Sequence, residues 1–479
     1  MRKNNHLIKK NIGTALLFLI DFTSVMLLLK GAILLRVNLM PYFLQFPEFP
    51  QRGFTFFWWI IPVWLFFFVY EGLYSKRFSF WDEVKTLWKI SFFSTLGVFS
   101  ILYLGKIGEQ VSRTVIVLMG ILSIPCLPLL RLLAKKVFHA FGLLKGKAII
   151  LGAGNTGRLI FDALMKDKNL GMNVVGFLDD DPQKIGDNIN GVRIHGGINK
   201  ARKYIGRCGI EDVVIAMPGC NREKLLSIVN DLQHETNNVL LIPDLFGLSV
   251  LGTNLQHFFQ EQAIGLEVRN NLAQPANKFI KKIFDMIVGL LLMILLAIPM
   301  LIISLLIRIN SKGPAIFLQD RIGRNNKMFR CYKFRTMYID AEERLQGLLV
   351  NDGQASKEWE KRWKLEKDPR ITKIGKLLRQ SSLDELPQIF NVLKGEMSLV
   401  GPRPVTQMEI DKYYKEQSRL YFGVPPGITG LWQVSGRSKT TYDHRIALDS
   451  WYVRNWNLWL DIVILFKTIK VVLKMEGAM

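Results

Sequence analysis

Cysteine and histidine are scarce in this chain of 479 residues, which contains four cysteines and six histidines. The cysteines lie far apart in the sequence: Cys126, Cys208, Cys220 and Cys331. No Cys-x-x-Cys pair exists, so the sequence predicts neither a cysteine-based zinc site nor a disulfide framework. The histidines also lack ligand spacing, which argues against a histidine-bound metal centre.

Acidic residues are few relative to basic ones. The 40 Asp and Glu residues face 63 Lys and Arg residues, so the formal net charge is +23. This charge favours nucleic acid, anionic lipid or phosphorylated substrates as partners. The chain is also 49% hydrophobic, with 31 Phe and 11 Trp residues, which is typical of membrane proteins with interfacial aromatic anchors. We therefore expect a lipid bilayer and phosphorylated substrates, and no nucleic acid, as partners.

Four apolar stretches predict a four-helix transmembrane bundle in residues 1–140, because a spanning helix needs about 20 apolar residues. They are residues 12–35, 54–70, 91–104 and 115–130. Basic residues gather before the first stretch, between the second and third, and after the fourth. The positive-inside rule then places the N-terminus and the rest of the chain in the cytoplasm. A charge at mid-bilayer costs about 2.5–3.5 kcal/mol, so we expect Asp21 to face the bundle interior.

A glycine-rich turn between two short apolar runs predicts a Rossmann-like α/β domain over residues 141–265. The first run, residues 147–151, leads into Gly-Ala-Gly-Asn-Thr-Gly, and the second, residues 174–178, ends in three aspartates. In the dinucleotide-binding pattern the glycines let the backbone approach a phosphate, and an acid about 20 residues later meets a ribose hydroxyl. The candidate cofactor-binding residues are Gly152, Gly154, Gly157 and Asp179.

The sequence leaves open whether this domain binds a nucleotide. The alternative is a retained fold that binds nothing or only a regulatory nucleotide. A short-chain nucleotide-sugar dehydratase or epimerase needs a Tyr-x-x-x-Lys pair, and no tyrosine in this chain has lysine four residues later. Redox catalysis by the domain is therefore disfavoured.

A further apolar run, residues 283–307, follows three lysines, precedes Arg308 and contains Pro299. Its length suits a span, but a fifth span would carry everything after it out of the cytoplasm. Proline removes a backbone hydrogen bond and bends a helix. We therefore predict a re-entrant membrane helix over residues 275–310 that enters and leaves on the cytoplasmic side. An ordinary kinked span is the alternative.

Two adjacent carboxylates, Asp384 and Glu385, stand in the segment Ser-Leu-Asp-Glu-Leu-Pro-Gln that begins at Ser382. Ser-x-x-Glu is also a capping box, which starts a helix without any chemistry. The two interpretations are compatible, because a helix N-terminus favours anions. Neighbouring residues on a helix point in different directions, so one carboxylate can attack phosphorus while the other holds Mg²⁺. That ion needs only one or two protein carboxylates beside substrate phosphates.

These motifs resemble the bacterial sugar transferases, the polyprenyl-phosphate hexose-1-phosphate transferases, in their large form. The matching segments follow one another along the chain: residues 319–323 (Gln-Asp-Arg-Ile-Gly), 333–337 (Lys-Phe-Arg-Thr-Met), 368–375, 382–388, 397–404 and 426–437. The four predicted spans and the Rossmann-like domain also match the large members. The chain departs from the family at Gln380 and Ser381, where Lys-Thr is frequent.

The resemblance implies a reaction and residue roles. A UDP-sugar gives its hexose-1-phosphate to undecaprenyl phosphate and releases UMP through a covalent aspartyl-phosphosugar intermediate. Asp384 would be the nucleophile and Glu385 the Mg²⁺ ligand. The phosphates would be held by Arg379, Arg403, Lys333 and Arg335. The α-rich catalytic domain, residues 311–479, would lie on the cytoplasmic side of the bacterial inner membrane and start O-antigen, capsule or exopolysaccharide synthesis.

Several features leave alternatives. Residues 241–247 resemble the galactose-specific type, so UDP-galactose is the expected donor and UDP-glucose the alternative. The apolar and basic run 451–474 predicts an interfacial amphipathic helix or one docked on the protein's own core. A homodimer is also expected. A membrane-anchored nucleotide-sugar dehydratase, or a non-catalytic nucleotide sensor whose Ser-x-x-Glu is only a cap, are the alternatives to the transferase.

Overall fold

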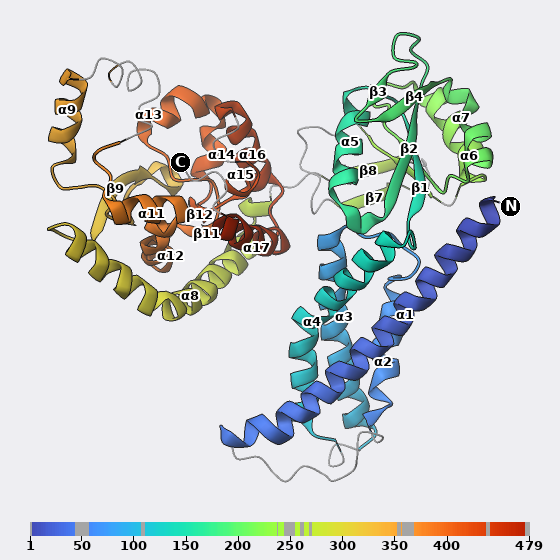
Figure 1. Cartoon of the computed structure of the whole chain (residues 1–479), viewed down its shortest axis with the longest axis horizontal. Coiled ribbons are helices and arrows are strands. Elements are labelled where there is room, and N and C mark those ends of the chain that lie inside the picture. The colour runs from blue at the N-terminus through green and yellow to red at the C-terminus, as the bar shows by residue number, and fades with distance from the viewer. Residues whose placement is uncertain are drawn as a thin grey trace. The chain divides into compact units, whose positions relative to one another are not determined.

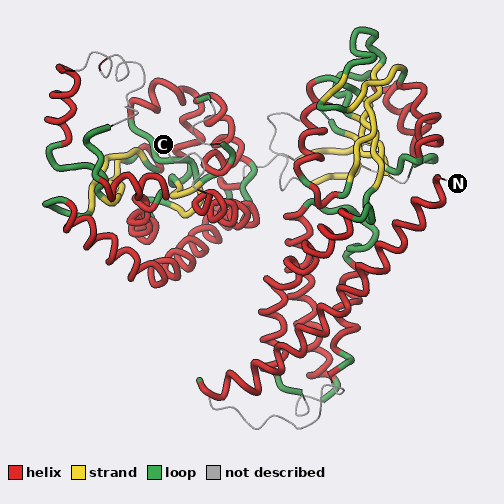
Figure 2. Tube along the Cα trace, in the orientation of Figure 1, coloured by secondary structure: helices red, strands yellow, loops and turns green. Residues whose placement is uncertain are grey.

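The computed structural model describes residues 2–43, 57–106, 111–236, 238–243, 254–258, 263–267, 271–351, 356, 368–436 and 441–474. The chain forms two compact units, Met1–Asp244 and Leu245–Met479 (Figures 1 and 2). The finer division predicted at residues 140, 265 and 310 stays a prediction. The segment 241–247, which suggested galactose, lies partly outside the described residues.

The first unit begins with four helices: α1 (Arg2–Leu34), α2 (Ile60–Tyr70), α3 (Phe80–Leu104) and α4 (Arg113–Ala140). Helices α1, α3 and α4 are long and apolar enough to cross a membrane, as predicted. Helix α2 has only 11 residues, fewer than the span predicted at residues 54–70, of which 54–56 lie outside the described residues. Pro62 explains the late start of α2, because proline is tolerated in the first turn of a helix but clashes with the carbonyl four residues earlier in its interior.

Asp21 faces the interior of this bundle, as predicted, and is 2% exposed. It accepts a hydrogen bond from the Tyr74 hydroxyl at 2.8 Å and pairs with Arg131 of α4. Arg131 also pairs with Glu83 of α3 and donates to the Leu73 carbonyl. Arg131 of α4 therefore links α1 and α3 through Asp21 and Glu83.

A six-stranded sheet follows the bundle. Its strands are β1 (Gly146–Leu151), β2 (Met172–Asp179), β3 (Asn188–Ile189), β4 (Val192–Gly196), β5 (Asp212–Ile215) and β6 (Asn238–Leu241). The order is β3-β4-β2-β1-β5-β6, and all pairs are parallel except β3 with β4. This doubly wound order confirms the predicted Rossmann-like domain.

Successive residues of a strand point to opposite faces of the sheet, so β1 contributes apolar side chains to both faces. Ala148 and Ile150 pack with α5 (Asn155–Lys166). Ile149 and Leu151 pack on the other face with α6 (Ala201–Cys208) and α7 (Arg222–Gln233). Figure 1 shows α5 on one side of the sheet and α6 and α7 on the other. A buried strand with helices on both faces is typical of a parallel sheet.

The second unit is rich in helices and short strands. Its strands are β7 (Asn254–Phe258), β8 (Ala263–Glu267), β9 (Ile316–Ile322), β10 (Met328–Phe334), β11 (Ser398–Val400) and β12 (Gly427–Thr429). Its helices are α8 (Pro275–Asn310), α9 (Ala341–Asn351), α11 (Lys373–Ser381), α12 (Ile389–Lys394), α13 (Gln407–Glu409), α14 (Ser418–Phe422), α15 (Leu431–Val434), α16 (Tyr442–Arg454) and α17 (Leu458–Lys474).

Helix α8 is 36 residues long and forms an arc along one side of this unit (Figure 1). Near its start Lys281 pairs with Asp461 of α17. At its middle, Gly289 faces Val392 and Leu393 around α12. Near its end Ile307 belongs to a hydrophobic cluster with Phe334 of β10. The helix thus returns to the domain on which it started, and the side chains on its other side, such as Ile294 and Leu295, are exposed and apolar.

Helix α17 corresponds to the predicted amphipathic run. Its first half buries Asp461, Val463 and Ile464 in the core of the second unit. Its second half exposes apolar side chains, including Ile469 and Leu473. The helix is therefore docked on the protein's own core over its first half, which was the alternative to a purely interfacial helix.

Candidate active site

A cavity of about 2940 Å³ in the second unit contains the two adjacent carboxylates. Asp384 and Glu385 lie in a 3₁₀ turn, Leu383–Gln388, and not at the start of a regular α-helix. Pro387 explains the turn, because it has no N–H to donate to the carbonyl four residues earlier. Ser382 makes no side-chain capping bond and has a left-handed φ of 57°, so the capping box suggested by the sequence is not formed.

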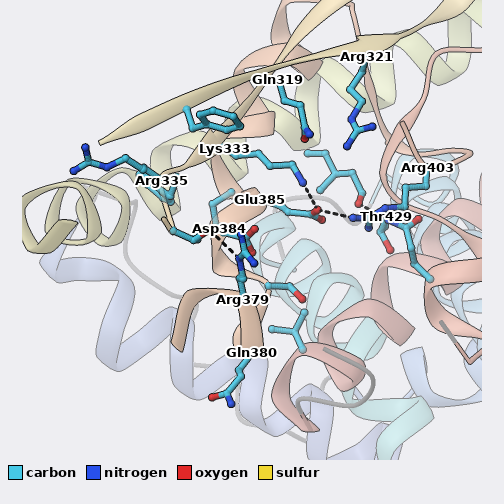
Figure 3. A pocket seen from close by; sticks show the side chains of 18 of the residues that line it. Gln319, Arg321, Lys333, Arg335, Arg379, Gln380, Asp384, Glu385, Arg403 and Thr429 are labelled. Carbon is cyan, nitrogen blue, oxygen red and sulfur yellow. Dashed lines mark hydrogen bonds and ion pairs between the residues drawn. The ribbon is translucent and has the colours of Figure 1, made fainter. Parts of the chain in front are cut away.

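Two cations from different elements meet at Glu385 (Figure 3). Lys333 of β10 places Nζ 2.9 Å from Oε1, and Arg403, which follows β11, places one Nη 3.1 Å from the same oxygen. β10 carries Lys333 because it pairs in register with β9. Lys333 and Arg403, which lie 52 and 18 residues from Glu385 along the chain, therefore converge on one carboxylate. Their predicted role as phosphate ligands stays a prediction.

Asp384 lies next to this group and is half-buried. Burial, and then the charge of Glu385, raise the pKa of Asp384 to about 6 from 3.8. The positive charges of Lys333, Arg379 and Arg403 act in the opposite direction without cancelling this effect. Arg379 of α11 is held by a hydrogen bond of 2.9 Å from its Nε to the Thr336 hydroxyl. A carboxylate with a raised pKa beside fixed cations suits nucleophilic attack on a phosphate.

The structure places Arg335 differently from the other predicted phosphate ligands. It lines the cavity, but its guanidinium donates to the carbonyls of Lys312 and Ser311, at 2.7 and 2.8 Å, and to the Ser311 hydroxyl. These groups follow the C-terminus of α8, where backbone carbonyls lack helical partners and favour a cation. Figure 3 shows the Arg335 side chain directed away from Glu385. The structure thus gives Arg335 the role of fixing the end of α8.

A residue that sequence reasoning missed, Arg445 of α16, also lines the cavity. Its guanidinium lies 4.7 Å from the ring centre of Trp432 and 4.9 Å from that of Tyr442, and its nearest carboxylate, that of Glu409, is 3.6 Å away. Among the described residues, its Nε and one Nη are buried without a hydrogen-bond partner. Such donors suit an anionic ligand. No local pattern around residue 445 marks it in the sequence.

The acid pair can be tested as a magnesium site. In the part of the chain that the structure describes, no group of three or more His, Cys, Asp or Glu side chains could hold a metal ion. Mg²⁺ is commonly bound by one or two carboxylates together with substrate phosphates. Asp384 and Glu385, set among phosphate-attracting cations, fit that arrangement, with Glu385 as the predicted ligand.

The glycine-rich loop of the first unit is built as predicted, but its acid is engaged. Asp179 accepts hydrogen bonds from the backbone N–H of Ala153 at 2.8 Å and of Asp181 at 2.9 Å. Gly152 has a left-handed φ of 98°, and a Cβ on Gly157 would clash with the Gly152 carbonyl. The local backbone conformation and close packing therefore require glycine at positions 152 and 157 even without a ligand. A Cβ on the third, Gly154, would meet open space, so only this position leaves room for a ligand.

Comparison with known proteins defines the class of the chain. The bacterial sugar transferase family matches residues 276–475, and a CoA-binding domain family matches residues 69–243. Individual relatives match the chain over most of its length, and the chain belongs to the bacterial sugar transferases, as its motifs suggested.

Two relatives carry galactose in their names. The chain is 39% identical to the undecaprenyl-phosphate galactose phosphotransferase of Salmonella typhimurium, over 85% of this chain and 84% of that protein. It is 38% identical to the UDP-galactose-lipid carrier transferase of Erwinia amylovora, over the same shares. A third, the UDP-glucose:undecaprenyl-phosphate glucose-1-phosphate transferase of Klebsiella pneumoniae, is 34% identical over 71% of this chain and 70% of that protein.

Proposed function

We propose that this sugar transferase moves a hexose-1-phosphate from a UDP-sugar to undecaprenyl phosphate in the bacterial inner membrane. The observation that carries the proposal is the acid pair Asp384–Glu385, held among Lys333, Arg379 and Arg403 in a cavity bounded by the apolar helix α8. Cations beside a nucleophile stabilise the charge of a transferring phosphoryl group. The product is the first lipid-linked sugar of O-antigen, capsule or exopolysaccharide synthesis.

The reaction proceeds in two displacements at one phosphorus. An oxygen of Asp384 forms a bond to the phosphorus that bears the sugar, the bond to the bridging oxygen breaks, and UMP leaves with the electron pair. An oxygen of undecaprenyl phosphate then attacks the same phosphorus, and the bond to Asp384 breaks, which restores the carboxylate. Lys333, Arg379 and Arg403 hold the phosphates in line. Glu385 would hold Mg²⁺, which would further neutralise the phosphate charge.

We propose the re-entrant arrangement for α8, with the catalytic unit in the cytoplasm. The support is geometric: Lys281 near the start, Gly289 in the middle and Ile307 near the end all contact the same folded unit. A helix anchored to one domain over its whole length does not carry the chain to the other side of a bilayer. The exposed apolar side of the arc then lies in the membrane. We also propose that the protein forms a homodimer.

Galactose is the proposed hexose, and two galactose-named relatives at 38–39% identity support it over the glucose-named relative at 34%. The test is UMP release from a panel of UDP-sugars with undecaprenyl phosphate and Mg²⁺. We expect release with UDP-galactose, dependent on the lipid, and loss in Asp384→Asn. The matched control is Asp411→Asn, an exposed carboxylate outside the cavity. No release with any UDP-sugar from folded protein would overturn the proposal and favour the nucleotide sensor.

A further inference from the structure

Two helices of the second unit carry apolar stripes that line the cavity containing the carboxylates. On α8 the stripe includes Val288, Leu292 and Leu296, and on α17 it includes Leu465, Ile469 and Val472. Residues three or four apart lie on the same side of a helix. Each helix therefore presents a continuous apolar side to this cavity.

A buried ion pair fixes the two helices to each other near the start of both stripes. Nζ of Lys281 on α8 lies 2.7 Å from Oδ2 of Asp461 on α17, and the two residues are 4% and 0% exposed. Tyr452 and Trp456 also donate hydrogen bonds to Asp461. The two stripes thus leave from one fixed crossing and form the walls of an apolar groove.

The other end of the α8 wall reaches the carboxylates. Leu296 belongs to a hydrophobic cluster with Leu383 and Leu386, the residues that flank the acid pair in the 3₁₀ turn. The α17 wall is tied to β12 by a hydrogen bond of 2.7 Å between the hydroxyls of Thr468 and Thr429. Thr429 lines the same cavity as the acid pair (Figure 3). One end of the groove is therefore cationic and reactive, and its walls are apolar.

We infer that this groove binds the isoprenoid chain of the acceptor lipid, with the lipid's phosphate at the cations beside the carboxylates. The inference rests on the proposed function. An isoprenoid chain has no hydrogen-bonding group and suits walls of Leu, Ile and Val, whereas a nucleotide or a sugar would leave polar groups unpaired there. From Val288 to Leu296 the α8 wall is about 12 Å long, so it holds the part of the chain next to the phosphate.

The test separates the two half-reactions in nanodiscs prepared either without undecaprenyl phosphate or with a defined mole fraction of it. Leu292→Trp fills the groove from α8, and Ile469→Trp fills it from α17. The matched control is Ile294→Trp, two residues along α8 on its exposed side and outside the cavity. The first half-reaction is measured as the burst of UMP without acceptor, which also shows that each variant is folded. The second is measured as KM for undecaprenyl phosphate.

We expect both groove variants to raise KM for the lipid about tenfold, to keep a burst of one UMP per enzyme and to leave the control near wild type. An unchanged KM in both variants would overturn the inference and leave the groove to bulk membrane lipid. Loss of the burst in both groove variants, with a normal burst in the control, would overturn it in favour of a donor site. Absence of a burst from the wild-type protein would instead contradict the proposed function.

Discussion

Replacing Asp384 by asparagine should stabilise the folded catalytic unit while it abolishes turnover. The reason is that burial, together with the charge of Glu385, raises the pKa of Asp384 to about 6, above its ordinary value of 3.8. At neutral pH a carboxylate with a raised pKa is still ionised, and its ionisation lowers the free energy of unfolding. Asparagine has nearly the same shape and carries no charge, so it removes this destabilisation.

The magnitude follows from the two pKa values. The interval between 3.8 and about 6 corresponds to about 3 kcal/mol, because each pH unit is worth about 1.4 kcal/mol. Asparagine should recover about 1–3 kcal/mol of this, or about 3–10 °C in Tm for a unit of this size. The sign also fixes the pH window. The folded state binds the proton more tightly than the unfolded state, so the destabilisation is complete above pH 6 and disappears as the pH falls towards 3.8.

Thermal unfolding in detergent with a chelator, at pH 7.5, 6 and 5, measures this difference. We expect Asp384→Asn to have the higher Tm at pH 7.5 and the difference to shrink to about half at pH 5, because that pH lies about midway between 3.8 and 6. The control is Asp368→Asn in the same unit. Burial opposes ionisation there too, but the hydrogen bonds from Arg370 hold the pKa of Asp368 below its ordinary value, so this variant should be less stable at pH 7.5. An equal or lower Tm for Asp384→Asn, or a difference that does not change with pH, would refute the reasoning.

Four further outcomes are expected. kcat/KM for the donor should fall about tenfold per pH unit below about pH 6, because Asp384 must be ionised in the free enzyme; a flat profile between pH 5 and 7 would contradict this. Glu385→Gln should move that inflection to lower pH, since the charge of Glu385 raises the pKa of Asp384, and should lower turnover at least about 100-fold. Ser382→Gly should raise the free energy of unfolding by about 1 kcal/mol, because φ is 57° there, whereas Ser382→Ala should not. Arg131→Met should destabilise the first unit by about 3–5 kcal/mol in thermal unfolding, because it leaves the buried Asp21 uncompensated.

Much of the candidate site was predictable because its chemistry needs particular residue types. A phosphate-transfer centre needs fixed cations near a carboxylate, and Lys333 and Arg403 do meet at Glu385. Arg335 shows the limit of this reasoning. An arginine that holds a phosphate and one that holds the carbonyls at a helix end need the same fixed guanidinium, so only the fold distinguishes them. Arg445 was not predictable, since its environment is built from α15 and α16 and no short spacing records it.

Two errors of local structure were avoidable from the sequence. Pro62 disfavours an α-helix that starts several residues earlier, and α2 begins at Ile60, although α4 and α8 accommodate prolines in their interiors. Pro387 removes an α-type hydrogen bond inside the Ser382 motif, and the motif forms a 3₁₀ turn without a capping box. In both places the pattern of apolar and polar residues indicates a helical segment, and the missing N–H of proline limits where a regular α-helix forms. The parallel sheet was predicted well, because its buried strands are nearly continuous runs of aliphatic residues.

Two features that work against the stability of the second unit lie within three consecutive residues, Ser382 to Asp384. Ser382 has a left-handed backbone conformation, and Asp384 is a half-buried carboxylate next to the charge of Glu385. Leu383 and Leu386 anchor this turn to α8 through Leu296. The same apolar contact that holds the strained turn in place also excludes water from Asp384, which makes its carboxylate more basic than an ordinary one and yet mostly ionised above pH 7. The apolar helix is therefore part of the chemistry, because it helps to set the reactivity of the nucleophile that a lipid phosphate must reach.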